Sequence, residues 1–210
     1  MSNEFGRIAF TPTVKAVQTE QGSRESYEKA DAKDWHNDEL HEGERAFIAE
    51  RDSFYMASVS ESGWPYVQHR GGPPGFVKVL DSKTLGMADF RGNRQYISVG
   101  NLKTNDRAAL IFMDYPNKQR LKILAHVELV GVDRAEVLAA VQVPDYKARV
   151  ERAMLIHVAA FDWNCPQHIT PRYTKEEVER AIGPLKLRIQ SLERELATLK
   201  EQTGRTRGQS

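Results

Sequence analysis

The fold is indicated first by the stretch MADFRGNRQYISVGNLKTN, which runs from Met87 to Asn105. Its apolar beginning predicts a strand that ends at Ala88 or Asp89. The glycine-containing turn that follows predicts a change of structure, and the residues from Asn93 to about Leu102 are expected to form a helix. The stretch therefore predicts a strand, a turn and a helix in close succession.

The turn of this stretch is a candidate binding site for a phosphate group. Asn93, Arg94 and Gln95 stand where backbone N–H groups and a guanidinium can point at the same anion. We hypothesise that these three residues bind the phosphate of a nucleotide. An arginine in a capped turn is also common on a solvated surface, so both interpretations stay open at the level of sequence.

Short β-rich segments separated by turns extend outward from this stretch on both sides. With so few residues between them there is little room for crossover helices, which favours an antiparallel barrel over a doubly wound sheet. The sequence predicts a mainly β fold of the α+β class with six strands and flanking helices. The six segments are Phe54–Val59, Trp64–Arg70, Phe76–Leu80, Thr84–Ala88, Ala108–Asp114 and Leu121–Val132.

Other segments have helical or ambiguous patterns. Asp38–Arg51 and Arg134–Val141 have apolar residues at helical spacing, and Ala153–Phe161 could be a final strand. The run Gly71–Gly75, GGPPG, fits neither helix nor strand. Its glycines could let a flat ligand approach the backbone, or the run could be a plain connection.

The tail of the chain has the clearest helical pattern. Thr174 and Glu177 form a capping box, and apolar residues then recur at alternating steps of four and three. This spacing predicts a coiled-coil-like helix, with a kink or two abutting helices at Gly183-Pro184. Pairing with a second chain is favoured over packing on its own barrel. The seam consists of Val178, Ile182, Leu185, Ile189, Leu192, Leu196 and Leu199.

The chain divides by pattern into four parts. Residues 1–37 are polar without a sustained period and are expected to form an N-terminal arm that is loose or wraps a partner subunit. Residues 38–173 form the barrel domain, 174–203 the C-terminal helical segment and 204–210 a disordered tail.

Composition limits the classes of function. The 210 residues include 30 basic and 29 acidic side chains, so no charge excess favours nucleic acid or an anionic membrane. A single cysteine, Cys165, excludes an internal disulfide. The sequence has no signal-peptide-like or membrane-spanning apolar run, and we expect a soluble, cytoplasmic protein.

Catalytic and metal-binding residues are harder to nominate. Cys165 and His168 are three residues apart, but no third residue or oxyanion element nearby supports a nucleophile and base. The six histidines have no paired metal spacing, so no metal site is expected. His69 and His168 could donate or accept a proton, yet each is more often a structural histidine, and the catalytic residues stay unknown.

Three runs of the sequence, taken together, resemble a known family. The runs are Gly63–Asp81 (GWPYVQHRGGPPGFVKVLD), Asp89–Leu110 (DFRGNRQYISVGNLKTNDRAAL) and Gln119–Gly131 (QRLKILAHVELVG). They resemble the FMN-binding split-barrel family of pyridoxamine 5'-phosphate oxidase, in particular its flavin-nucleotide-binding branch. The resemblance covers about residues 40–132, and the NCPQHITPRY element is also typical of that branch.

The resemblance implies a six-stranded split barrel in a homodimer, with FMN bound at the subunit interface. It places one edge of the flavin along the strand after Gly-x-Pro, the phosphate at the turn, and a further contact from the last barrel strands. A small-molecule substrate or electron donor would be the other partner. The implied cofactor-binding residues are Gln68, His69, Arg70, Gly71, Gly72, Ala88, Asp89, Phe90, Asn93, Arg94, Gln95 and Arg120.

The sequence departs from the family's oxidase at several positions. Pro73 and Gln95 stand where the oxidase has lysines, and Arg120 stands where it has a glutamine. No match to the oxidase's C-terminal Trp-x-Arg stretch is found. Authentic pyridoxamine phosphate oxidase activity is therefore not expected.

Two functions from different classes follow from the resemblance. The first is an FMN-dependent oxidoreductase that moves a hydride or electrons between a reduced donor and a small acceptor. The second is a non-catalytic flavin-binding protein that serves as a carrier, a sensor or an interaction partner. A third, weaker possibility is a split barrel that holds haem or a deazaflavin.

Overall fold

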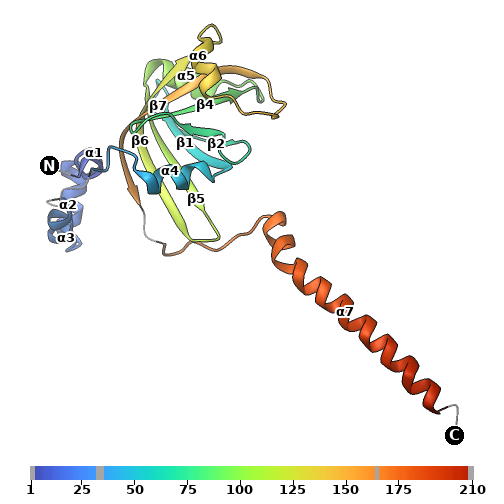
Figure 1. Ribbon diagram of the computed structural model, residues 1–210. Helices are drawn as coiled ribbons and strands as arrows, with labels where there is room; N and C mark the ends of the chain where they lie inside the picture. The colour runs from blue at the N-terminus through green and yellow to red at the C-terminus, as the bar shows by residue number, and fades with distance from the viewer. Residues whose placement is uncertain (1–2, 32–35, 164–165, 208–210) are drawn as a thin grey trace. The chain divides into compact units, whose positions relative to one another are not determined.

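The structure, a computed structural model, describes residues 3–31, 36–163 and 166–207 (Figure 1). The chain forms two compact units. The first comprises residues 1–114 and 118–169, and the second comprises residues 115–117 and 170–210. The sheet and the candidate site both belong to the first unit.

The first unit is built on one antiparallel sheet of seven strands in the order β2-β1-β5-β6-β7-β4-β3. With its flanking helices the fold is α+β and mainly β, as expected. The expected count of six strands was wrong. The segment considered only as a possible final strand is the longest strand and joins β6 to β4. The strands are β1 (Ser53–Val59), β2 (Pro65–Gly71), β3 (Val77–Val79), β4 (Thr84–Phe90), β5 (Arg107–Asp114), β6 (Gln119–Val130) and β7 (Val150–Trp163).

Side-chain alternation explains why these segments form strands. In β5 every second residue is buried, and β1 alternates in the same way. β1 and β2 pair from Ser53 opposite Gly71 to Val59 opposite Pro65, on either side of a turn at residues 60–63. The first two predicted strands therefore form a hairpin.

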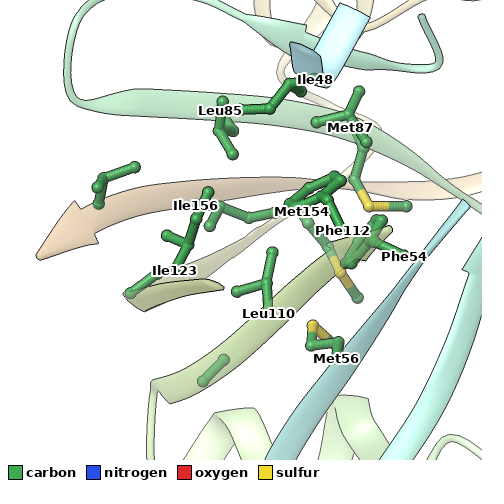
Figure 2. Packing of buried hydrophobic residues seen from close by; sticks show 14 of the residues in the cluster. Ile48, Phe54, Met56, Leu85, Met87, Leu110, Phe112, Ile123, Met154 and Ile156 are labelled. Atoms are coloured by element: carbon green, nitrogen blue, oxygen red, sulfur yellow. The ribbon is translucent and has the colours of Figure 1, made fainter. Parts of the chain in front are cut away.

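The core lies on the inner face of the curved sheet. Phe112 stacks on Phe54 with ring centroids 4.8 Å apart, and Phe54 stacks in turn on Phe76 at 6.0 Å. Figure 2 shows Phe112 and Phe54 among Met154, Met56 and Leu110, which come from different strands. Residues from six of the seven strands, all but β2, contribute to this cluster, so its packing supports the curvature of the sheet.

Two helices pack beside the sheet. α4 (Glu42–Ala49) has a capping box with His41 and Glu44, and it buries Phe47 and Ile48 against the core. The Trp163 indole donates to the Glu44 carboxylate at 2.7 Å, which ties α4 to β7. α6 (Ala135–Ala140) packs on the smaller apolar cluster that includes Ala153.

The N-terminal residues form helices, although their sequence has no sustained period. α1 (Glu4–Ala9), α2 (Pro12–Glu20) and α3 (Arg24–Asp31) are short, and α1 and α2 begin at the caps Asn3 and Thr11. α1 packs on β7. The beginnings of α1 and α2 are marked by capping residues and not by a sustained apolar period. Apolar periodicity therefore did not reveal them.

The second unit consists mainly of α7 (Lys175–Arg207). The predicted capping box is present: the Glu177 amide donates to Thr174 Oγ1 at 3.1 Å, and the Thr174 amide donates to the Glu177 carboxylate at 2.7 Å. α7 is one helix with Pro184 inside it, so the two abutting helices considered from the sequence are not formed. No helix among the described residues is both long enough and apolar enough to span a membrane.

Candidate functional site

The turn between β4 and the next helix has an unusual backbone. Arg94 and Tyr96 both adopt positive φ, 64° and 54°, a region that costs non-glycine residues energy. The Asn93 side chain accepts a hydrogen bond from the Gln95 amide at 3.2 Å and closes the turn. The helix, α5 (Ile97–Thr104), therefore begins at Ile97 and not at Asn93 as expected.

α5 is fixed to the sheet by buried polar contacts. Ser98 Oγ donates to the Gln68 side-chain oxygen at 2.7 Å, and Asn101 donates to Ser58 Oγ at 3.0 Å. These bonds link the first and second turns of the helix to β2 and β1. They hold the preceding turn beside the strand that carries Gln68.

A buried ion cluster lies below the turn. Arg70 Nη1 of β2 is 2.5 Å from Asp89 Oδ1 of β4, and Arg152 Nη1 of β7 is 3.2 Å from Asp89 Oδ2. The three side chains are 11%, 7% and 18% exposed, in the order Arg70, Asp89 and Arg152. Since β2 is one edge of the sheet and β4 lies next to the other edge, Asp89 joins regions that are far apart in the strand order.

A second acidic residue organises the rim of the site. Glu151 forms ion pairs with Arg91 and Arg152 at 3.3 Å each, and it accepts a hydrogen bond from the Tyr96 hydroxyl at 3.1 Å. The guanidinium of Arg152 also lies 5.4 Å from the centre of the Tyr96 ring. The left-handed Tyr96 is thus held by β7 through two contacts.

Arg94, in the same turn as Tyr96, carries a positive charge. A hydrogen bond to the Tyr96 side chain, followed by the charge interactions with Tyr96 and Glu151, raises the pKa of Arg94 above its already high ordinary value. The side chain is therefore positively charged at any physiological pH. It is available to bind an anion.

These elements surround an open pocket of about 220 Å³. Six of the twelve residues proposed from the sequence line it: Gln68, Arg70, Asp89, Phe90, Asn93 and Arg94. The structure thus brings the flavin-edge strand and the phosphate turn of the resemblance to one place. The other lining residues are Gly92, Tyr96, Ile97, Ser98, Val99 and Glu151.

Three of the other proposed residues belong to β2 and the glycine run. His69 projects from the opposite face of β2, where its ring contacts Tyr55. Gly71 and Gly72 do not line the pocket. A Cβ at Gly72 would lie 2.7 Å from the Phe76 ring, so this glycine is required by a close approach of the core.

The last three proposed residues also lie outside the pocket lining. Ala88 is 1% exposed and packs in the smaller apolar cluster. Gln95 is exposed and does not line the pocket, and its backbone amide donates to the Asn93 side chain. Arg120 lies in β6 opposite Met113, on a strand that contributes nothing to the pocket.

Sequence reasoning missed the contribution of β7. Glu151 and Arg152 stand just before the segment considered as a final strand, and no motif connects them to the turn. The burial pattern of β7 does not alternate between Val150 and Met154, so periodicity offered no signal for these residues. Tyr96 and Ser98 were missed because the helix was expected to begin before them.

The alternative chemistries receive no support from the described residues. Cys165 lies outside the part of the chain that the structure describes, so its relation to His168 is not defined. Within that part, no group of three or more His, Cys, Asp or Glu side chains could hold a metal ion.

Comparisons with solved structures find similarity over part of the chain to several proteins. A candidate pyridoxamine 5'-phosphate oxidase from Lactobacillus delbrueckii is 20% identical with a TM-score of 0.47, and the match covers 60% of this chain and 96% of that one. HupZ from Group A Streptococcus is 14% identical with a TM-score of 0.46, covering 64% and 99%. An FMN-binding protein from Syntrophomonas wolfei is 16% identical with a TM-score of 0.41, covering 70% and 97%.

Sequence comparison is decisive for the family. No curated protein matches the sequence. The family model described as pyridoxamine 5'-phosphate oxidase, by contrast, matches residues 40–164, which include all seven strands up to Trp163, the turn and the pocket. The chain therefore belongs to the pyridoxamine 5'-phosphate oxidase family.

Proposed function

We propose that the protein is an FMN-binding oxidoreductase that transfers a hydride or electrons between a reduced donor and a small acceptor. The observation that carries the proposal is the convergence of Gln68, Arg70 and Arg94 on one pocket in a chain of this family. Bound FMN would supply the redox-active ring. The residues of this chain would bind it, orient it and neutralise its phosphate.

The donor set of the pocket fits such a ligand. Arg94 offers a charged donor in the left-handed turn, and Asn93 lies beside it for the phosphate. Arg70 Nε is buried and has no hydrogen-bond acceptor among the described atoms, although the other end of the guanidinium is bound by Asp89. A small shift of the Arg70 side chain on binding would be needed to bring this donor to a ligand carbonyl or ring nitrogen.

The bound state is proposed to be a homodimer with FMN at the subunit interface. A pocket of about 220 Å³ is smaller than the roughly 300–1,000 Å³ of sites that enclose ligands of this size, so a second subunit would complete its walls. The outer face of the sheet supports this. On this face Tyr55 and Val67 are exposed, and together with Ile111 they line an apolar pocket that Phe5 of α1 also lines.

Authentic oxidation of pyridoxamine phosphate is not part of the proposal. Pro73 and Gln95 replace two cations of the family's oxidase, and neither lines the pocket. The C-terminal stretch that helps the oxidase to hold its substrate is replaced by α7. We infer a different small acceptor.

The proposed function is tested by the spectrum of the purified protein and by its reduction. We expect a flavin absorption spectrum, release of FMN on denaturation, and a mass of two chains by light scattering. Anaerobic NADH or NADPH should bleach the flavin rapidly. Slow bleaching by every donor would instead indicate a flavin-binding protein without turnover, and a protein that takes up no added FMN would refute the proposal.

Arg94→Ala should weaken FMN binding by roughly tenfold to a hundredfold, because it removes a charged contact to the phosphate. The thermal unfolding midpoint should not change, since the side chain is exposed. Fluorescence titration of the apoprotein with FMN measures the affinity.

Arg91→Ala is the matched control for this variant. Arg91 is a nearby arginine that pairs with Glu151 and does not line the pocket. Its removal should change the FMN affinity only slightly. Equal losses in both variants would mean that general charge attraction, and not a phosphate contact from Arg94, governs binding.

A further inference from the structure

α7 carries an exposed stripe of large apolar side chains. Six of them are between 44% and 63% exposed: Val178, Leu185, Ile189, Leu192, Leu196 and Leu199. Together with Ile182 they follow the alternating four-and-three spacing of a coiled-coil seam. A surface of this kind is covered by another protein surface in the functional state.

The residues that disturb the helix lie away from this seam. If Val178 is placed at heptad position d, Ile182 and Ile189 occupy position a, whereas Gly183 and Pro184 occupy b and c. Positions b and c face away from a partner helix. Pro184 therefore removes a hydrogen bond on the outer side and leaves the seam continuous, as the single helix of the structure requires.

The charges that flank the seam are complementary to those of an identical helix. In a parallel pair, a residue at g faces the residue at e five positions later on the other chain. Arg188 at g then faces Glu193, and Glu195 at g faces Lys200. Both pairs are attractive, and each occurs twice because a twofold axis relates the chains.

The seam composition favours one orientation and one number of strands. The a positions hold Ile182, Ile189 and Leu196, and three of the four d positions hold leucine. Isoleucine at a with leucine at d favours parallel two-stranded coiled coils. We propose that α7 forms a parallel, in-register, two-stranded coiled coil with α7 of a second copy of this chain.

The sequence of α7 itself favours a partner helix. Helices in water are marginal without tertiary contacts, and a proline and a glycine within the helix both disfavour it. Burial of the seam by a second helix would offset these costs. The coiled coil does not involve the cofactor pocket. The coiled-coil proposal can therefore be refuted while the proposed FMN-binding function stands, and the function can be refuted while the coiled coil stands.

Thiol cross-linking in the full chain tests this proposal. In a Cys165→Ser background, Leu196→Cys places a thiol in the seam, and Leu187→Cys places one at the outer position f, where the side chain is 67% exposed. In a parallel in-register pair the two thiols at position 196 face each other. We expect them to form a disulfide at least about tenfold faster than those at position 187, because only facing positions meet the geometry of the bond.

Three outcomes would overturn the proposal. Equal oxidation rates at the two positions would show that the seam is not paired. A disulfide that forms only when Leu185→Cys and Leu196→Cys chains are mixed would indicate an antiparallel pair, because these two positions face each other there. A mass of one chain by light scattering would show that α7 does not pair with a second copy.

Discussion

Phe112→Ala is expected to lower the free energy of unfolding by about 3–5 kcal/mol. Phe112 is completely buried and stacks on Phe54, with the ring planes 23° apart. It belongs to the cluster to which six of the seven strands contribute, and it lies there among Phe54, Met154 and Leu110 (Figure 2). Truncation leaves a cavity that strands paired on both sides of β5 cannot collapse to fill. Urea unfolding followed by fluorescence measures the loss.

Phe112→Leu is the control at the same position. It keeps most of the apolar volume, so the loss should stay below about 1.5 kcal/mol. If Phe112→Ala costs no more than Phe112→Leu, the cluster is not closely packed, and the curvature of the sheet has another origin. An unchanged denaturant slope in both variants would show that only stability has changed.

Local pattern was sufficient to predict most of the sheet. The hairpin of β1 and β2 follows from two β-rich runs around a turn, and β5 and β6 follow from two more such runs. The strand count was wrong because the segment from Ala153 was considered only as a possible strand, and β7 extends it back to Val150 through the charged residues Glu151 and Arg152. Long-range pairing was therefore required to recognise the strand.

The start of α5 shows a second limit of sequence reasoning. Asn93 is a good helix cap by residue type, yet its side chain closes a tight turn to Gln95 instead. Positive φ at Arg94 and Tyr96 then delays the helix. The residue types of Arg94 and Tyr96 do not predict a positive φ. The contacts of Tyr96 with β7 hold its left-handed conformation in place.

The candidate site was predicted in part, and strand alternation explains the division. Gln68 and Arg70 point to the same face of β2 and line the pocket, whereas His69 between them points to the other face. A family resemblance that covers a whole strand includes both faces. Only the register of the strand separates the residues that can touch a ligand from those that cannot.

Asp89→Ala is expected to destabilise the protein by about 3–5 kcal/mol, because it leaves two largely buried arginines without a counter-charge. Asp89 holds Arg70 of β2 and Arg152 of β7 at the place where the curved sheet brings these strands together. The same variant should lose FMN binding in proportion to the displacement of Arg70. Urea unfolding and FMN titration measure the two effects separately.

Asp106→Ala is the matched control, since its carboxylate is 58% exposed and pairs only with His126 among the described contacts. Its cost should be within about 0.5 kcal/mol. A double-mutant cycle with Arg70→Met tests the mechanism: once Arg70 is removed, Asp89→Ala should cost less, because fewer buried charges remain uncompensated. Strictly additive losses would show that Asp89 does not act through Arg70, and that the ion cluster does not join the two ends of the sheet around the pocket.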